Sequence, residues 1–258
     1  WMADMIDRLQ APAAASGARI VFSCGFDSIP FDLGVLMLQT EMKARFGQAA
    51  TRVRGRVRKM KGTFSGGTAA SLKATMAAAA SQPGVLDLLK NPFSLTPGFE
   101  GPRQPSGHKP MVDEALGDGV WVAPFVMAAI NTRNVHRSNL LLKHAYGTDF
   151  VYDEMLVTGP GEKGEAIANA VAGDKSLGSD KGPKPGEGPT PAAQLADVSI
   201  ASGGSQAALS SIASATGGRP ENGQRPVGPD AADLCLLAAD ADARPARPFG
   251  GGRGGTQR

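Results

Sequence analysis

The sequence predicts an α/β protein with a mixed sheet, because short strand patterns alternate with longer helical patterns along the chain. Residues 19–22 form a β-branched and aromatic run that is typical of a buried strand, and Gly25 follows as a turn residue. A helical pattern begins directly after this turn and continues to about residue 46. We therefore expect one half of a βαβ unit near the start of the chain.

The bend at residues 25–30 is the leading candidate for a binding site. Ser28 or Asp27 can cap the helix, and Pro30 suits its first turn, where no backbone N–H is needed. Ligands of open α/β sheets collect where strands end and helices begin, because a helix N-terminus offers free N–H groups and partial positive charge. The residues of this candidate site are Gly25, Phe26, Asp27, Ser28 and Pro30.

The next strand pattern, residues 51–61, places four arginines on one face. These are Arg52, Arg54, Arg56 and Arg58, and Val53, Gly55 and Val57 take the other face. Four guanidinium groups in a row need water, carboxylate partners or an anionic ligand. We expect a solvated edge of the sheet, with an arginine-lined groove for a phosphate group as the alternative.

A glycine turn leads into a helix expected at residues 69–80. Ser65 or Thr68 can cap this helix, while Gly66 and Gly67 let the backbone aim several N–H groups at one point, which is the geometry of an anion nest. A plain turn with a cap explains the same residues equally well. The long loop at residues 91–107 should follow the surface, either as a connection or as a lid.

The helix expected at residues 131–142 carries two polar residues on an otherwise apolar stripe. Asn131 and Ser138 share this stripe with Val135, so their side chains need partners, which substrate, a cofactor amide or neighbouring backbone could supply. Arg137 and Asn131 are the pair to test first. A strand at residues 149–158 and a short helix at residues 162–171 complete the regular pattern.

Three motifs together resemble a known family. They are CGFDSIPFDLG at residues 24–34, KGTFSGGTAAS at residues 61–71, and WVAPFVM with INT and RSN between residues 121 and 139. In this order and spacing they resemble the saccharopine dehydrogenase-like oxidoreductases, which include the bacterial trans-acting enoyl reductases. The resemblance runs from residue 1 to about residue 189.

The resemblance implies a nicotinamide-dependent oxidoreductase, with NADP or NAD bound at the bend. Residues 1–47 would be the C-terminal part of a Rossmann-like domain, residues 48–172 an α/β substrate domain, and residues 173–258 a low-complexity, largely disordered tail. No G-x-G-x-x-G follows a strand here, so we expect a fragment without the main phosphate-binding loop.

The resemblance also implies roles for individual residues. Asp27 would lie near the nicotinamide, and Asp27 and Arg137 are the candidate catalytic residues. The candidate substrate-binding residues are Ser65, Gly66, Gly67, Thr68, Asn131 and Ser138. The sequence has Asp-Ser-Ile-Pro where saccharopine reductases have Asp-Pro-Gly, which favours an acyl or lipid-like substrate over lysine-pathway chemistry.

Bulk properties exclude several other classes. A net charge of +3 without a clustered basic face argues against a nucleic-acid partner. Two distant cysteines favour a reducing compartment, and three histidines without metal-ligand spacing give no metal site. No apolar run is long enough for a transmembrane segment. We expect a cytoplasmic protein, with peripheral membrane attachment and a homodimer as options. A non-catalytic lipid- or protein-binding module is the alternative function.

Overall fold

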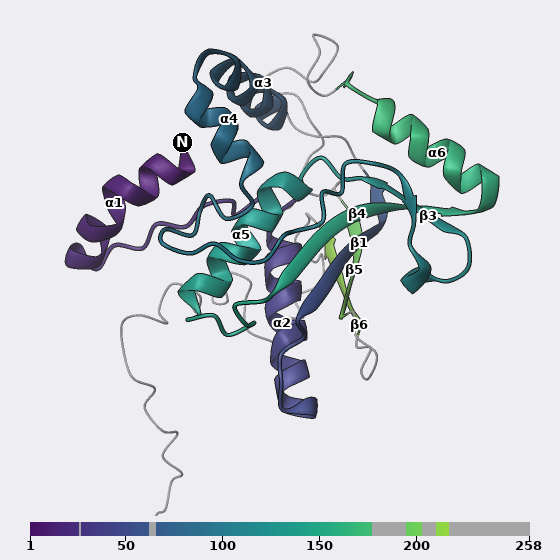
Figure 1. Ribbon diagram of the computed structural model, residues 1–258, viewed down its shortest axis with the longest axis horizontal. Coiled ribbons are helices and arrows are strands. Elements are labelled where there is room, and N and C mark those ends of the chain that lie inside the picture. The colour runs from purple at the N-terminus through teal and green to yellow at the C-terminus, as the bar shows by residue number, and fades with distance from the viewer. Residues whose placement is uncertain (26, 62–65, 177–194, 203–209, 217–258) are drawn as a thin grey trace, which may run out of the picture.

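One mixed sheet organises the fold in the computed structural model, which describes residues 1–25, 27–61, 66–176, 195–202 and 210–216. The strand order is β2-β3-β4-β1-β5-β6 (Figure 1). Strands β1 and β4 are parallel, and the other neighbouring pairs are antiparallel. The strands are β1 (Arg52–Lys61), β2 (Met111–Val112), β3 (Val120–Pro124), β4 (Val151–Pro160), β5 (Leu195–Ser202) and β6 (Ser210–Thr216). The expected α/β class with a mixed sheet is confirmed.

Helices flank this sheet, and most begin and end close to where the sequence places them. They are α1 (Met2–Ser16), α2 (Ile29–Phe46), α3 (Gly66–Ser81), α4 (Pro83–Lys90), α5 (Ala128–Leu141) and α6 (Gly161–Gly173), with a 3-10 turn at Glu114–Leu116. Helix α2 packs against α5, β5 and β6, and α6 packs against β3 and β4. Helices α1, α3 and α4 lie farther out (Figure 1).

The main core lies between β1, β4 and the helices α2 and α5. It contains Phe31, Val35, Leu38 and Met42 of α2, Val53 and Val57 of β1, Val135 of α5, and Phe125, Phe150 and Tyr152. The side chain of Gln39 joins α2 to the start of β1, because it donates to the Ala50 carbonyl and accepts from the Ala50 amide, at 2.9 and 2.7 Å. The sequence-based boundary at residues 47 and 48 thus falls between two elements that share one core.

Residues 19–22 are not a strand, which corrects the first expectation. They are irregular, and Ile20 and Val21 are 48% and 45% exposed. A strand exists only where its backbone groups pair with a neighbour, and none of the described strands lies in register beside these residues. The β-branched residues favour an extended backbone, but a strand also needs a neighbouring strand to pair with, and the local pattern does not show whether one is present.

The expected solvated edge at β1 is also wrong, because β1 lies inside the sheet between β4 and β5. Arg56 is buried, and its guanidinium contacts Asp113 at 2.6 Å and Asp153 at 2.8 Å. Arg52 contacts Asp153 at 3.0 Å. Carboxylates therefore neutralise Arg52 and Arg56. Alternation identified the face of the strand correctly, but it carries no information on the strand's place in the sheet.

Two other segments differ from the expectation. The loop at residues 91–107 is partly buried rather than wholly superficial, since Phe93, Leu95 and Thr96 are nearly inaccessible to water. Within residues 173–258, β5 and β6 form strands of the sheet, paired to β1 and to each other. Residues 173–176, at the end of α6 and just after it, are also described. The rest of that region lies outside the described residues.

Candidate functional site

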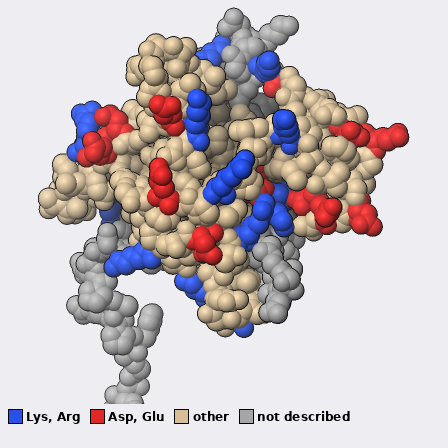
Figure 2. All heavy atoms as spheres, in the orientation of Figure 1, with Lys and Arg blue, Asp and Glu red and all other residues tan. Residues whose placement is uncertain are grey.

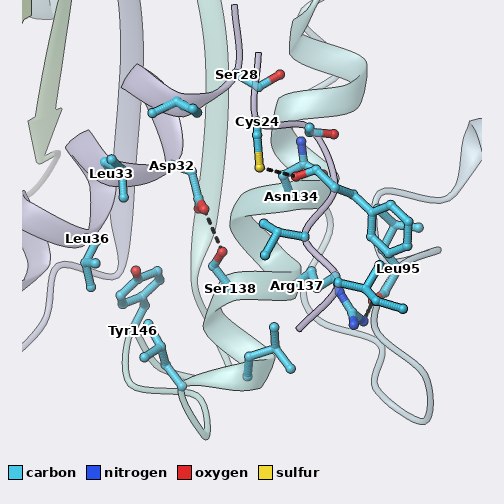
Figure 3. A pocket seen from close by; sticks show the side chains of 17 residues that line it. Cys24, Ser28, Asp32, Leu33, Leu36, Leu95, Asn134, Arg137, Ser138 and Tyr146 are labelled. Atoms are coloured by element: carbon cyan, nitrogen blue, oxygen red, sulfur yellow. Dashed lines mark hydrogen bonds between the residues drawn. The ribbon is translucent and has the colours of Figure 1, made fainter. Parts of the chain in front are cut away.

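A cavity of about 110 Å³ lies between the N-terminal half of α2, the helix α5 and residues 20–24 (Figure 3). Its walls are largely apolar, with Ile20, Val21, Phe22, Ile29, Leu33, Leu36, Leu95, Leu141 and Leu142. Its polar lining residues are Ser23, Cys24, Ser28, Asp32, Asn134, Arg137, Ser138 and Tyr146. The structure therefore brings three of the sequence-based candidates, Ser28, Arg137 and Ser138, to one cavity.

A carboxyl–hydroxyl pair joins the two helices inside this cavity. Asp32, in the first turn of α2, and Ser138 of α5 point toward each other in Figure 3, and Ser138 Oγ donates to Asp32 Oδ2 at 2.8 Å. Burial raises the pKa of Asp32 to about 6, and the Ser138 hydrogen bond offsets part of this effect. Asp32 therefore exchanges its proton close to neutral pH.

Three buried polar atoms of the cavity residues have no hydrogen-bond partner within the described part of the chain. They are Asp32 Oδ1, Asn134 Nδ2 and Tyr146 Oη. Burial, together with the negative charge of Asp32, raises the pKa of Tyr146, so its hydroxyl group stays protonated and available as a donor. Since an unmet buried donor or acceptor costs about 1–3 kcal/mol, these atoms mark a place where a polar ligand group gains hydrogen bonds.

Arg137 borders the same cavity, but protein atoms hold its guanidinium. It donates to the Leu95 carbonyl at 3.1 Å and to Gln10 Oε1 at 3.2 Å. Burial lowers the pKa of Arg137, but a guanidinium keeps its charge at neutral pH. Arg137 thus ties the cavity wall to the loop after α4 and to α1.

The bend at residues 25–30 does not offer the free amides that the sequence suggested. The N–H groups of Ser28 and Ile29 both donate to the Gly25 carbonyl, at 3.1 and 3.0 Å, and Pro30 has none. Neither Ser28 nor Asp27 caps α2 through its side chain. Burial raises the pKa of Asp27. The Asp27 carboxyl group lies so close to Gly25 that a Cβ atom at position 25 would be 2.9 Å from Asp27 Oδ1. Phe26 lies outside the described residues.

Asn131 lies behind the bend in a second polar cluster. Its Nδ2 atom donates to the Asp27 carbonyl and to Glu154 Oε2, each at 2.9 Å. Tyr152 Oη donates to Glu154 Oε1 at 2.7 Å. Protein atoms are thus the partners of Asn131 Nδ2, as the backbone alternative for this stripe had allowed, while Asn131 Oδ1 has no partner among the described residues.

The glycine turn before α3 lies apart from this cavity. Gly66, Gly67 and Thr68 are the first residues of α3 and do not line it, and Ser65 lies outside the described residues. Helix α3 begins at Gly66, three residues before the expected start. The structure thus does not join this substrate-binding candidate to Ser138 and Arg137.

Sequence reasoning missed Asp32, Asn134, Tyr146 and Glu154. Asp32 meets Ser138, and Glu154 meets Asn131, only in the folded chain, because these partners are distant in sequence. One signal was available: adjacent acids, Asp153 and Glu154, interrupt an otherwise apolar strand, which requires buried partners. Asp32 gave a similar signal among the apolar residues that begin α2.

Two larger hollows lie elsewhere. One of about 330 Å³ is lined by Arg52, Arg54 and Arg56 together with Asp113, Glu114 and Asp153, so its formal charges balance. The other, of about 460 Å³, lies beside residues 104–108 and the start of α5. On the face seen in Figure 2, acidic and basic side chains are interspersed. The smaller cavity remains the candidate because three of its lining residues carry buried polar atoms without a partner among the described residues, whereas the lining of the 330 Å³ hollow has one, Arg52 Nε.

Other features of the described residues can be reported briefly. No group of three or more His, Cys, Asp or Glu side chains among them could hold a metal ion. None of their helices has the length and apolar character needed to cross a bilayer.

Comparisons with known proteins identify relatives of this chain. A provisionally named trans-acting enoyl reductase of Mycobacterium tuberculosis is 36% identical over 217 residues, covering 75% of this chain and 52% of the relative. Trans-acting enoyl reductases of Mycobacterium leprae and Mycobacterium bovis are 33% and 34% identical, over 67% and 65% of this chain and 44% and 42% of the relatives. The chain is homologous to the mycobacterial trans-acting enoyl reductases.

The chain spans about half the length of the curated reductases that it matches. No protein-family model matches it, and no solved structure does.

Proposed function

We propose that this chain is the acyl-binding part of an NAD(P)-dependent enoyl reductase of the saccharopine dehydrogenase-like group. The reaction would reduce a carbon–carbon double bond conjugated with the carbonyl of an acyl or lipid-like substrate. One observation carries the proposal: the apolar cavity between α2 and α5 is lined by the Asp32–Ser138 pair and by Tyr146, whose hydroxyl has no partner among the described residues. The names of the homologous reductases support the same class of reaction.

The cavity residues suit the two requirements of such a reduction, a partner for the developing negative charge and a source of the proton. Hydride addition to the β-carbon leaves negative charge on the acyl oxygen, and a proton must then reach the α-carbon; a bound nicotinamide would supply the hydride. Tyr146 Oη would donate a hydrogen bond to the acyl oxygen, since a preorganised donor in a dry site stabilises developing charge. Asp32, with its pKa near 6, would deliver the proton.

The bend at residues 25–30 does not fit the phosphates of a dinucleotide, because the N–H groups of Ser28 and Ile29 are already used within the chain. We therefore assign no phosphate contact to the bend. The contact of Gly25, Asp27, Ser28 and Pro30 with the cofactor stays a prediction, with the nicotinamide end as its target. The dinucleotide phosphates would be held by the half of the reductases that this chain does not span.

Thioester binding tests the proposal without requiring turnover. Crotonyl-N-acetylcysteamine, a small unsaturated thioester, should bind the chain saturably in an NMR titration and shift signals of Asp32, Ser138 and Tyr146. Tyr146→Phe should weaken binding about tenfold, the effect of one lost hydrogen bond of about 1.4 kcal/mol.

Thr40→Ala is the control, because Thr40 is exposed on α2 and bonds only to its own helix. It should leave the thioester affinity unchanged. Absence of saturable binding, or equal binding by Tyr146→Phe and the native chain, contradicts the proposal.

A further inference from the structure

The Glu154 carboxyl group is enclosed in a space that two neighbouring strands make for it. Glu154 is 1% exposed, in the middle of β4 and opposite Gly55 of β1 in the parallel register. A Cβ atom at Gly55 would lie 2.9 Å from Glu154 Cγ and 3.0 Å from Tyr152 Oη, too close for any larger residue without movement. The absence of a side chain at Gly55 thus leaves space for the hydrogen bond between Tyr152 and Glu154.

Both oxygens of this carboxyl group accept hydrogen bonds from neutral donors. Tyr152 Oη donates to Oε1, and Asn131 Nδ2 donates to Oε2. The charged neighbours are Asp153 on β4, which raises the pKa of Glu154, and Arg56 on β1, which lowers it, while burial has the largest effect. No cation contacts the carboxyl oxygens directly among the described residues, so Glu154 is not part of a structural ion pair.

Asn131 links the Glu154 carboxyl group to the bend at residues 25–30. One Nδ2 hydrogen bonds to Glu154 and the other to the Asp27 carbonyl, so a single amide group joins β4 to the residue before Ser28. If the Asn131 side-chain amide were flipped, its Oδ1 atom would face the Asp27 carbonyl oxygen, and two acceptors cannot form a hydrogen bond. The observed orientation is therefore strongly favoured. Ser28 and Ile29, next along the chain, line the cavity.

We infer that Glu154 is a positioning residue, which fixes the bend beside the Asp32–Ser138 cavity by orienting Asn131 against the Asp27 carbonyl. It does not line this cavity, although it borders the 460 Å³ hollow beside residues 104–108, and it acts on the bend through Asn131. The inference rests on the proposed function only in treating this cavity as the substrate site. The placement of the bend can be measured without substrate.

Hydrogen exchange at the Ser28 and Ile29 amides is the direct measurement. Glu154→Leu removes the acceptor for Asn131, so exchange at these two amides should accelerate about tenfold, as for loss of one buried hydrogen bond. Amides in the last turns of α2 and in β1 should exchange at native rates. Glu154→Gln keeps an acceptor for Asn131 and should restore slow exchange at the bend.

Asn131→Ala gives a second test that leaves β4 unchanged, and it should accelerate the same two amides by a similar factor. Glu114→Gln, on an exposed acid of the 3-10 turn, is the control and should change no amide in α2. Uniform acceleration throughout α2 and β1 in Glu154→Leu, or native exchange at Ser28 and Ile29 in Asn131→Ala, overturns the inference. A native bend that fails to bind the thioester counts against the proposed function instead.

Discussion

At the scale of single residues, burial rather than pairing sets the ionisation of the key groups. It raises the pKa of Asp32 to about 6 and that of Glu154 to about 8, and it lowers the pKa of His136 to about 4. The His136 ring packs at 4.5 Å from Phe93, between ring centroids, and also contacts Phe150. At neutral pH, Glu154 is therefore mostly protonated and His136 uncharged.

The pH dependence of stability should report Glu154. Its pKa is about 8 in the folded chain against a normal value of 4.5, so between these values the folded state keeps a proton that the unfolded state has lost. The folded state is therefore favoured most below pH 4.5, and the advantage is lost as pH rises to 8. At about 1.4 kcal/mol per pH unit, the total is about 5 kcal/mol.

Urea denaturation of the native chain and of Glu154→Gln at several pH values measures this contribution. The difference in free energy of unfolding between the two proteins should change by several kcal/mol from pH 4.5 to pH 8. Asp32 and the other acids are present in both proteins, so their titration cancels. Parallel pH profiles would show that Glu154 ionises normally in the folded chain.

The sequence predicted part of the site at this scale. Ser28, Arg137 and Ser138 were chosen from helix-start chemistry, the helical stripe and the family motifs, and all three line the cavity. Tyr146 and Glu154 were not found, because the groups that act on them, the charge of Asp32 and the amide of Asn131, lie far away in the sequence. Local patterns report which face a residue occupies and not which residue lies opposite.

At the scale of elements, helical periodicity located both the helices that pack on the sheet, α2, α5 and α6, and the helices α3 and α4, which lie farther out. Helix α2 ends at Phe46 as expected, where Gly47 adopts a left-handed conformation with φ of 73° and donates to the Lys43 carbonyl. Strand patterns were less informative: residues 51–61 and 149–158 gave β1 and β4, whereas residues 19–22 gave no strand. Helices satisfy their own backbone groups, but strands depend on a partner that the local sequence does not specify.

Strand β1 should depend on Arg56 far more than on Arg52. Arg56→Met leaves the buried Asp113 without its cation, and breaking a buried ion pair costs about 3–5 kcal/mol. We expect a loss of about 3 kcal/mol in the free energy of unfolding, measured by urea denaturation at neutral pH.

Arg52→Met is the matched control on the same face of the same strand. The Arg52 side chain is 37% exposed, and its partner Asp153 keeps the contact with Arg56, so the loss should stay below about 1 kcal/mol. Equal losses for the two variants would contradict the view that Arg56 is the buried structural cation of the sheet.

At the scale of the whole molecule, the sequence predicted the class of the fold but not its sheet order. The central pair, β1 and β4, is joined across about ninety residues that contain α3, α4, α5 and the strands β2 and β3. This order depends on how α2 and α5 pack against the strands, a long-range property. Strands β5 and β6 were missed because they are rich in Ala and Ser, and their places come from pairing, of β5 with β1 and of β6 with β5.

The proposed division of roles between the two halves of the homologous reductases leads to a prediction for the whole chain. The chain spans about half of those proteins, it contains the cavity that we propose binds the acyl group, and the amides of Ser28 and Ile29 are engaged within the chain. We therefore expect NADPH fluorescence to show no saturable change when the chain is added at micromolar concentrations. The full-length Mycobacterium tuberculosis relative is the positive control and should bind. Saturable micromolar binding by this chain would mean that its own residues hold the dinucleotide phosphates, and the assignment of those phosphates to the other half of the reductase would be wrong.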